Sequence, residues 1–420
     1  MIHTRDHLEL LEASCHKITC LTKGPFLIMK ARNYYYLPMI AAGLLRILVM
    51  ALVFIVQPAQ FCVYGFQDRQ SQSAGGRHSD LYGKVIDNAT KAPLHGANVF
   101  IAGTMIGCAT DREGAFSLQN VPAGSHELIV SMMGYHLQKL KITQGGMPNQ
   151  PLVFKMEQRV LQAPEIIISL ADIKKREKRL ETFIKYFIGE TKNSSKCKIL
   201  NPESILIEED EDTKEMRAWS EEEIVIENRG LGYTMKYVLE NFLLTDSLVS
   251  FEGKQFFSEL TPKNKRESKK WRKNRLKAYR GSLRHFLHAL CSNALASEGY
   301  EAALYQGGNN LYWGVASSLF RPQLVLKKAK HESERILSFT GMVIIFYTRE
   351  SEPMKYRRLR KRKASRKRAR HQQSWLQLRA AQTTIDVLGR SYQPIDILKG
   401  GYMGWELLSE ALPWEYLPEK

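Results

Sequence analysis

The sequence is poor in cysteine, and it lacks apolar runs of the length that membrane-spanning helices need. Six cysteines among 420 residues are too few for a small disulfide scaffold. Hydrophobic residues make up 44% of the chain and charged residues 25%, which is typical of globular domains. This composition excludes a mostly disordered chain and a polytopic membrane protein. At roughly 150 residues per domain, the length predicts two or three domains.

The chain has an excess of positive charge, but this charge is unevenly distributed. The formal net charge is +18 and the sequence pI is about 9.5. Residues 263–280 contain ten basic residues and one acidic residue, and residues 354–370 contain eleven basic residues and no acidic one. Outside these two tracts and a weakly basic N-terminal segment, the chain is mildly acidic. The overall pI therefore does not by itself indicate a nucleic-acid-binding protein.

Residues 1–67 are typical of an export leader. The uncharged apolar run 47–56 has the length of a signal-peptide core, and Lys30 and Arg32 precede it as a basic region. Because Met29 directly precedes this basic region, we expect translation to start there. The leader predicts that the following domains are exported.

Two fates of this leader remain open. Cleavage by a signal peptidase is expected between residues 59 and 67. The alternative is a retained membrane anchor over residues 37–56. This anchor would place Arg46 inside the bilayer, where inserting an arginine costs about 2.5–3.5 kcal/mol. Both interpretations place the remaining chain across the membrane, because upstream basic residues stay on the cytoplasmic side.

The segment that follows is polar and rich in glycine and serine, so residues 68–79 are predicted to be a flexible linker. Three cysteines remain beyond the leader: Cys108, Cys197 and Cys291. Their wide spacing leaves one long-range disulfide open and excludes a C-x-x-C metal or redox motif.

Residues 80–158 are predicted to form a small β-sandwich, because short β-rich runs alternate with turn residues every 8–12 positions. The seven predicted strands are 81–86, 97–102, 105–110, 115–118, 127–132, 136–143 and 152–156.

A series of glycines and turn residues runs through this segment in a fixed order. It consists of Gly83-x-Val85-x-Asp87, Pro93-Leu94-x-Gly96-Ala97-x-Val99, Gly103-Thr104, Gly107-x-x-Thr110-Asp111-x-x-Gly114-x-Phe116-x-Leu118, Pro122-x-Gly124 and Gly134-Tyr135. The series resembles the carboxypeptidase-like regulatory domain, a transthyretin-like (prealbumin-like) β-sandwich that is common in exported proteins of Bacteroidota. The resemblance implies that these residues determine the fold, and that the domain has no peptidase chemistry of its own.

The rest of the chain is interpreted as a linker at 159–182 and a mixed, β-rich domain with a few helices at 183–420. One or two helices are predicted within 269–298 and a short one at 405–412. The predicted strands are 204–207, 216–219, 223–226, 233–242, 247–251, 336–348, 383–388 and 395–398.

This second part resembles exported Bacteroidota proteins that carry the same first module. The similar stretches are Cys197–Pro202, Ile226–Tyr233, Trp271–Leu290 and Gly401–Tyr416. The resemblance implies no particular activity. The basic tract 354–370 looks like an insertion relative to that group.

Three residues are weak candidates for chemistry: His285, Arg275 and Tyr279. Ser282 and His285 are three residues apart, so a helix would bring them together as a nucleophile and a base. No G-x-S-x-G elbow surrounds Ser282, so a helix cap is the simpler interpretation.

Two spacings suggest metal ligands. The spacing of His285, His288 and Cys291 spreads three possible ligands over too wide an arc of a helix for a compact zinc site. His331 and Glu334 have an H-x-x-E spacing, but no suitable third ligand follows. We therefore expect no metal and no cofactor.

The basic tract offers a surface for polyanions, either anionic lipid or polyanionic glycan, with a solvated disordered loop as the simpler interpretation. Its candidate contact residues are Arg357, Arg358, Arg360, Lys361, Arg362, Lys363, Arg366, Lys367 and Arg368.

These observations favour an exported, non-catalytic binding or structural protein of the cell envelope, in the periplasm or at the outer membrane, with a protein or glycan partner. A chain anchored in the inner membrane is the alternative location. The alternative functions are a hydrolase of the peptidase type in the second domain, and polyanion or nucleic-acid binding through the basic tract. Nucleic acid is the less favoured partner because export separates the protein from DNA.

Overall fold

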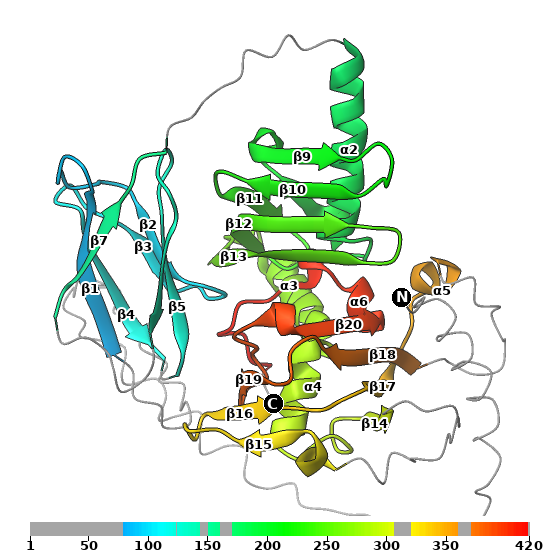
Figure 1. Ribbon diagram of the computed structural model, residues 1–420. Helices are drawn as coiled ribbons and strands as arrows, with labels where there is room; N and C mark the ends of the chain where they lie inside the picture. Colours follow the sequence, from blue (N-terminus) through cyan, green and yellow to red (C-terminus); the bar gives the residue numbers. More distant parts are fainter. Residues whose placement is uncertain are drawn as a thin grey trace, which may run out of the picture. The chain divides into compact units, whose positions relative to one another are not determined.

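The computed structural model describes residues 79–122, 124–142, 150–159, 170–305, 321–359 and 371–418 (Figure 1). The predicted leader, nearly all of the linker at 68–79, and most of the basic tract lie outside the described residues. Within the part of the chain that the structure describes, no helix combines the length and the apolarity that crossing a bilayer requires.

The first described segment is a β-sandwich of two sheets. One sheet has the strand order β4-β1-β7 and the other has the order β3-β2-β5-β6. Strand β1 is antiparallel to β4 and parallel to β7. The strands are β1 (Ser79–Asp87), β2 (Asn98–Ile101), β3 (Gly107–Ala109), β4 (Ala115–Val121), β5 (His126–Ser131), β6 (Gln138–Ile142) and β7 (Leu152–Met156).

The alternation of side chains explains this sandwich. On β1, Leu81 and Val85 are buried, whereas Tyr82 and Lys84 between them are exposed. Such a period of two gives each strand one face for the core. The buried residues of both sheets, which include Val99 and Phe116, form one hydrophobic cluster. The predicted seven-stranded β-sandwich is confirmed, and each strand lies within three residues of its expected bounds.

A long helix precedes the second group of strands. Helix α2 (Leu170–Ile188) runs across the boundary that the sequence places between residues 182 and 183. Its buried side chains Phe183 and Phe187 stack with ring centroids 4.8 Å apart, and Phe183 packs against Phe242 at 4.9 Å. The charged first part and the apolar last part therefore belong to one helix, whose last turns pack on a sheet.

That sheet has six strands in the order β8-β11-β12-β10-β9, with β13 paired to β12. Strand β12 pairs with β13 along its length, and on its other edge with β11 near its start and β10 near its end. The strands are β8 (Cys197–Ile199), β9 (Ile205–Glu209), β10 (Met216–Ser220), β11 (Ile224–Asn228), β12 (Tyr233–Leu244) and β13 (Val249–Glu259).

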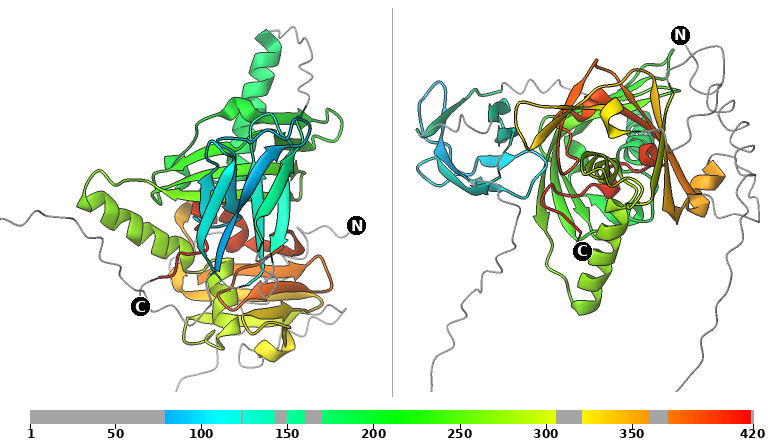
Figure 2. Two further views of the ribbon diagram at one scale, coloured as in Figure 1. Left: turned by 90° about the vertical axis from the view of Figure 1, so that its left-hand side faces the viewer. Right: turned by 90° about the horizontal axis from the view of Figure 1, so that it is seen from below.

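Two helices follow, α3 (Lys265–Tyr279) and α4 (Leu283–Cys291). Arg280 is extended, and the Ser282 side chain accepts the His285 backbone N–H at 3.2 Å as the N-cap of α4. The predicted helical region 269–298 is thus two helices, of which the first starts earlier and the second ends at Cys291. Figure 2 (left) shows α3 extending away from the strands.

The last part of the chain forms two further sheets. A four-stranded sheet has the order β14-β17-β18-β20, and a three-stranded sheet has the order β15-β16-β19. Helix α4 packs against both through Phe286, Leu287 and Leu290. The strands are β14 (Tyr300–Tyr305), β15 (Leu326–Lys328), β16 (Glu334–Leu337), β17 (Met342–Ser351), β18 (His371–Leu378), β19 (Thr383–Asp386) and β20 (Ile397–Gly401).

The remaining helices are short. They are α5 (Met354–Leu359), α6 (Tyr402–Trp405) and the 3-10 turns η2 (Ser194–Lys196), η3 (Pro202–Ser204), η5 (Pro322–Leu324), η6 (Pro394–Asp396) and η7 (Leu408–Glu410). The observed mixture of several sheets and few helices confirms the predicted fold class of the second part.

Two sequence-based predictions in this part were wrong. The predicted strand 336–348 is two strands, because β16 pairs within the three-stranded sheet and β17 within the four-stranded one. The predicted helix 405–412 is instead α6 followed by η7. Met403 of α6 packs in the core of α4, whereas Leu408 of η7 packs in the core of α2, so one continuous helix would not reach both.

Candidate functional site

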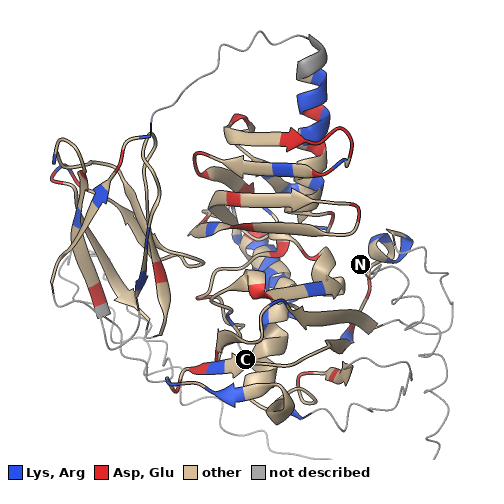
Figure 3. Cartoon of the chain, in the orientation of Figure 1, with Lys and Arg blue, Asp and Glu red and all other residues tan. Residues whose placement is uncertain are grey.

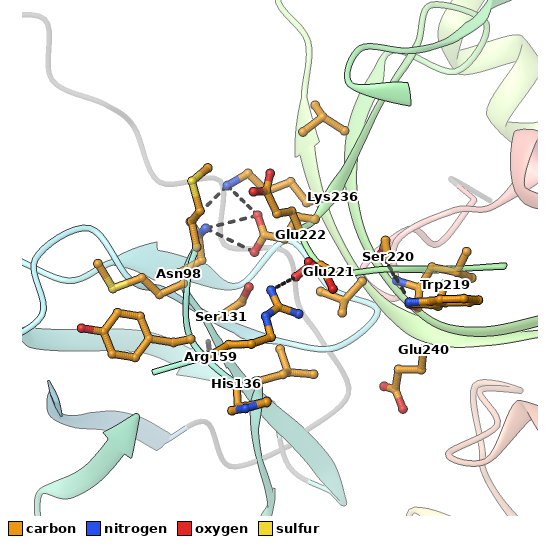
Figure 4. Close-up of a pocket in the computed structure, with 18 of the residues that line it drawn as sticks. Asn98, Ser131, His136, Arg159, Trp219, Ser220, Glu221, Glu222, Lys236 and Glu240 are labelled. Atoms are coloured by element: carbon orange, nitrogen blue, oxygen red, sulfur yellow. Dashed lines mark hydrogen bonds and ion pairs between the residues drawn. The ribbon is translucent and has the colours of Figure 1, made fainter. Parts of the chain in front are cut away.

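A pocket of about 550 Å³ lies between the β-sandwich and the six-stranded sheet (Figure 4). The sandwich contributes the start of β2, the end of β5, the turn that leads into β6 and the residues after β7. The six-stranded sheet contributes β10, β12 and the turn before β11. Polar residues of both parts therefore line one pocket, and among them are Asn98, Ser131, His136, Arg159, Ser220, Glu221, Glu222, Lys236 and Glu240.

Three residues form a connected set of polar contacts across this pocket. The Lys236 ammonium donates to the Asn98 side-chain oxygen at 3.0 Å and lies 3.2 Å from the Glu223 carboxylate. The Asn98 amide nitrogen donates to both Glu223 oxygens, at 3.2 Å each. Each group thus has a partner of the opposite polarity, which fixes the start of β2 against the six-stranded sheet.

Two further polar contacts join the pocket walls. Lys139 of β6 and Glu240 of β12 form an ion pair at 2.6 Å, with 38% and 24% of their side chains exposed. Arg159 donates to the backbone carbonyl of Glu221 at 2.8 Å. The described structure shows no ion pair for the carboxylates of Glu221 and Glu222, so both are available to a bound molecule.

Two aromatic residues also line the pocket, Trp219 from β10 and Tyr135 from the turn before β6. The Tyr135 hydroxyl donates to Asp87 at 2.9 Å, and the Gln158 amide donates to the same carboxylate oxygen at 2.9 Å. Hydrogen bonds from the Thr90 backbone and from Tyr135, among others, lower the pKa of Asp87 to about 2. Because this carboxylate stays ionised, it holds the Tyr135 ring in place.

A loop of the sandwich fixes the distance between the two pocket walls. The Gly103 N–H donates to the carbonyl of Gln255 on β13 at 2.7 Å, and the Phe257 N–H donates to the Thr104 carbonyl at 2.9 Å. On the other side, the Trp414 N–H donates to the Gly103 carbonyl at 2.9 Å. The loop is therefore held between an edge strand and the C-terminal segment, and it extends the backbone hydrogen bonding of the sheet.

The predicted candidate His285 lies elsewhere, in a buried aromatic cluster. Its Nδ1 accepts the Gly281 backbone N–H at 3.2 Å and pairs with the Tyr300 hydroxyl at 2.8 Å. Because a backbone N–H can only donate, Nδ1 is an acceptor, and Nε2 then donates to Glu298 at 3.3 Å. Burial lowers the pKa of His285, although the Glu298 hydrogen bond opposes this shift. Burial also raises the pKa of Tyr300 well above its ordinary value.

The other two candidates are engaged in packing. Tyr279 pairs with Nδ1 of His288 at 2.9 Å, and burial raises the pKa of the tyrosine to about 12. Arg275 donates to the Leu231 carbonyl at 2.7 Å and forms an ion pair with Glu259 at 2.6 Å. The structure brings Tyr279 and His285 together, with ring centroids 5.0 Å apart, but Arg275 is committed to the six-stranded sheet. Buried groups of this kind, each with a hydrogen-bond partner, stabilise the fold around them.

Among the described residues, neither the Ser282–His285 pair nor the two metal-ligand spacings have a geometry that supports catalysis. Ser282 bonds the His285 backbone and not its ring. The described residues contain no group of three or more His, Cys, Asp and Glu side chains that could hold a metal. Glu334, from the H-x-x-E spacing, is 6% exposed and accepts a hydrogen bond from Ser125 of the sandwich at 2.8 Å. Its carboxylate thus contacts the sandwich.

The three cysteines beyond the leader, Cys108, Cys197 and Cys291, are all free, so the long-range disulfide left open by the sequence is absent. Of the predicted polyanion contacts, only Arg357 and Arg358 are described. Both lie on α5, whose Tyr356 is buried, so the start of the basic tract is a helix and not a disordered loop. The contacts at Arg360, Lys361, Arg362, Lys363, Arg366, Lys367 and Arg368 lie outside the described residues.

The comparison with known families concerns the sandwich. Residues 81–168 match the family model of the CarboxypepD_reg-like domain. This segment is a CarboxypepD_reg-like domain. A domain of this kind is a non-catalytic regulatory or binding module. One wall of the pocket therefore belongs to a non-catalytic module.

Other comparisons add little. No curated protein matches the sequence. A chain of the type II cohesin–X-dockerin complex of Acetivibrio cellulolyticus is 22% identical, with 24% of this chain and 73% of that chain covered and a TM-score of 0.17. A protein of unknown function from Bacteroides fragilis is 11% identical, with 40% and 67% covered and a TM-score of 0.16. Similarity at this level carries no inference about function.

Sequence reasoning missed the pocket. Of its lining residues, only Tyr135 and Asn201 stood out in the sequence, Tyr135 in the Gly134-Tyr135 pair of the CarboxypepD_reg-like series and Asn201 in the stretch Cys197–Pro202. The two adjacent glutamates at 221–222 follow a predicted strand, and this was the one available signal for the opposite wall. Nothing in the sequence indicates that they face Arg159, because that proximity depends on how the domain packs against the six-stranded sheet.

Proposed function

We propose that this protein is an exported, non-catalytic binding protein of the cell envelope, and that it holds a glycan in the pocket between its CarboxypepD_reg-like domain and the six-stranded sheet. The single observation that supports this most directly is the pocket itself. Its volume of about 550 Å³ suits a small ligand or one unit of a larger polymer. Its walls come from two parts of the chain, which are held together by backbone hydrogen bonds.

The lining favours a ligand rich in hydroxyl groups. Trp219 and Tyr135 offer flat apolar faces, against which the C–H face of a sugar ring would pack. Glu221, Glu222 and the Ser131 hydroxyl add hydrogen-bonding groups to the same lining. Hydroxyls that donate to carboxylates form charge-assisted hydrogen bonds, which contribute about 1.5–3 kcal/mol each.

A binding assay with a matched control tests this proposal. The full chain is applied to an array of bacterial glycans, beside the variants Glu222→Gln and Glu113→Gln. Glu222 lies in the pocket, whereas Glu113 is exposed on a turn of the sandwich. We expect Glu222→Gln to weaken binding about 10- to 100-fold, in line with the loss of one charge-assisted hydrogen bond. The Glu113→Gln variant should bind like the wild type.

Three results would contradict the proposal. Equal losses in both variants would mean that the carboxylate in the pocket does not contact the ligand. Binding to a protein and to no glycan would show that the partner is a protein. Cleavage of the glycan would show a catalytic site and revive the hydrolase alternative.

Export is tested separately. Cells of the source organism are fractionated, and the N-terminus of the mature protein is identified by mass spectrometry. We expect a new N-terminus between residues 59 and 68 in the periplasmic or outer-membrane fraction. An intact chain in the cytoplasm would refute the envelope location.

A further inference from the structure

Helix α3 carries a dense band of positive charge on the side that faces away from the protein. Trp271 and Ala278 are buried on the opposite side. At about 100° per residue, the exposed basic side chains within the helix occupy an arc of about 160°. Figure 3 shows Lys and Arg along α3, and Figure 2 (left) shows this helix projecting from the strands. The exposed basic residues of α3 and its flanks, here called the α3 band, are Lys263, Lys265, Arg266, Lys269, Lys270, Arg272, Lys273, Lys277 and Arg280.

Most of the α3 band lies away from carboxylates in the described structure, although Lys277 and Arg280 at its end lie near Glu350 and favour the ionised form of that carboxylate. Glu267 is the only acidic residue of α3, and its carboxylate accepts the Lys263 backbone N–H at 2.7 Å. The Asn264 side chain accepts the Glu267 N–H at 2.9 Å, so both residues cap the helix. Within the described residues, no member of the α3 band forms an ion pair. Instead, Lys270 lies beside Lys196 and lowers the pKa of that lysine.

Like charges gathered in this way repel one another, and a bound anionic surface would remove that repulsion. Helix α3 is about 22 Å long at 1.5 Å per residue, so the α3 band can contact many anionic groups at once. Its charge therefore complements an extended anionic partner better than a single small anion.

The side chains of α3 also indicate which extended partner fits. The exposed face has no aromatic residue for stacking on bases, because Trp271 is buried and its indole N–H donates to the Arg229 carbonyl at 2.9 Å. The Asn274 amide donates to the Gly230 carbonyl at 2.7 Å and is not free to read base edges. Most members of the band are lysines, which act as compact point charges without directional recognition.

We propose that helix α3 attaches this protein to a membrane surface through anionic phospholipid headgroups. A projecting, convex helix reaches a flat surface without a groove, and mobile headgroups can gather under its lysines. The apolar face of α3 is packed on the protein, so the contact is electrostatic and involves no insertion into the bilayer. This inference is independent of the glycan pocket.

Vesicle co-sedimentation of the full chain tests the inference. Vesicles contain phosphatidylcholine alone or phosphatidylcholine mixed with phosphatidylglycerol, and the weakly basic leader contributes equally to every variant because none of the substitutions lies in it. The test variant is Lys265→Gln/Lys269→Gln/Lys273→Gln, in which exposed lysines of the α3 band are replaced by a residue of similar helix propensity. At about 1 kcal/mol per lysine near the surface, the excess binding to anionic vesicles should fall about 100-fold.

The matched control is Lys84→Gln/Lys141→Gln/Lys155→Gln, which removes the same charge from exposed positions of the sandwich. We expect it to retain the wild-type excess on anionic vesicles. Equal losses in both triple variants would refute a role for α3 and leave only net charge as the cause.

Two further results would overturn the inference. The first is a wild-type protein that binds soluble heparin or DNA but shows no preference for anionic vesicles, because the partner would then be a soluble polyanion. The second is loss of vesicle binding in a Lys361→Gln/Lys363→Gln/Lys367→Gln variant with full binding in the α3 variant. That result would assign the membrane contact to the basic tract.

Discussion

The contact between Gly103 and Trp414 gives a sharp test of how the CarboxypepD_reg-like domain is attached. Gly103 has a φ of +81°, and a Cβ at this position would lie 2.7 Å from the Trp414 indole nitrogen. Gly96 has nearly the same φ, +80°, but a Cβ there would meet no atom within 4 Å. Alanine at either position incurs backbone strain of about 1–2 kcal/mol. Only Gly103→Ala adds the overpacking against Trp414, which we expect to contribute about 1–3 kcal/mol more.

Thermal unfolding of the two variants measures this difference. For domains of this size, 1 kcal/mol lowers Tm by about 2–4 °C, so Gly103→Ala should melt about 2–12 °C below Gly96→Ala. Replacing Trp414 by leucine in the Gly103→Ala background should recover part of the loss, because the coupling between neighbouring residues is then removed. Equal Tm values for both glycine variants, or no recovery in the double variant, would show that the loop does not contact the C-terminal segment.

Three other outcomes are expected. Because burial lowers the pKa of His285 below its ordinary 6.5, only the unfolded chain gains that proton just below pH 6.5, so stability falls there as pH falls. His285→Gln should reduce this slope by up to about 1.4 kcal/mol per pH unit in urea titrations, and an unchanged slope would contradict the buried neutral histidine. Phe187→Ala should reduce the free energy of unfolding by about 3–5 kcal/mol, because Phe187 is 0% exposed and contacts four other rings; a loss below about 1 kcal/mol would place it outside the core. Asn264→Ala should destabilise by about 1 kcal/mol through loss of the α3 cap, with Asn264→Ser as the control that retains capping.

The sandwich was predictable from the sequence because its information is local. Strands such as β1 and β4 alternate buried and exposed residues, and turns such as those at Gly103 and Gly114 contain glycine at a positive φ that few other residues tolerate. The same local reasoning identified Ser282 as a helix cap. It also found Gly103-Thr104 as part of the series that identifies the domain. The physical role of Gly103 depends on Trp414, more than 300 residues away, and no local pattern contains that information.

The pocket and the buried histidine are two further features that local sequence could not predict. His285 was a candidate because of its spacing from Ser282 and His288, but its neighbours Tyr300 and Glu298 satisfy both ring nitrogens inside the core. The pocket residues carry no motif, since they come from strands that pair with different neighbours. Burial and partners decide whether a polar residue is structural or available, and both arise only on folding.

The CarboxypepD_reg-like domain contacts the six-stranded sheet through ion pairs in the pocket and through backbone and aromatic contacts outside it. These two kinds of contact differ in strength, and the difference has a testable consequence. The Lys139–Glu240 ion pair is partly exposed, and such pairs contribute about 0–1 kcal/mol. The backbone hydrogen bonds of the Gly103 loop and the Phe100–Phe256 contact, with ring centroids 5.3 Å apart, lie apart from the pocket. Attachment of the domain should therefore depend mainly on the loop, which leaves the charged pocket residues free to serve binding. Lys139→Gln should change the free energy of unfolding by less than about 1 kcal/mol while altering glycan affinity measured by calorimetry. A large loss of stability without any change in affinity would reverse this assignment of roles.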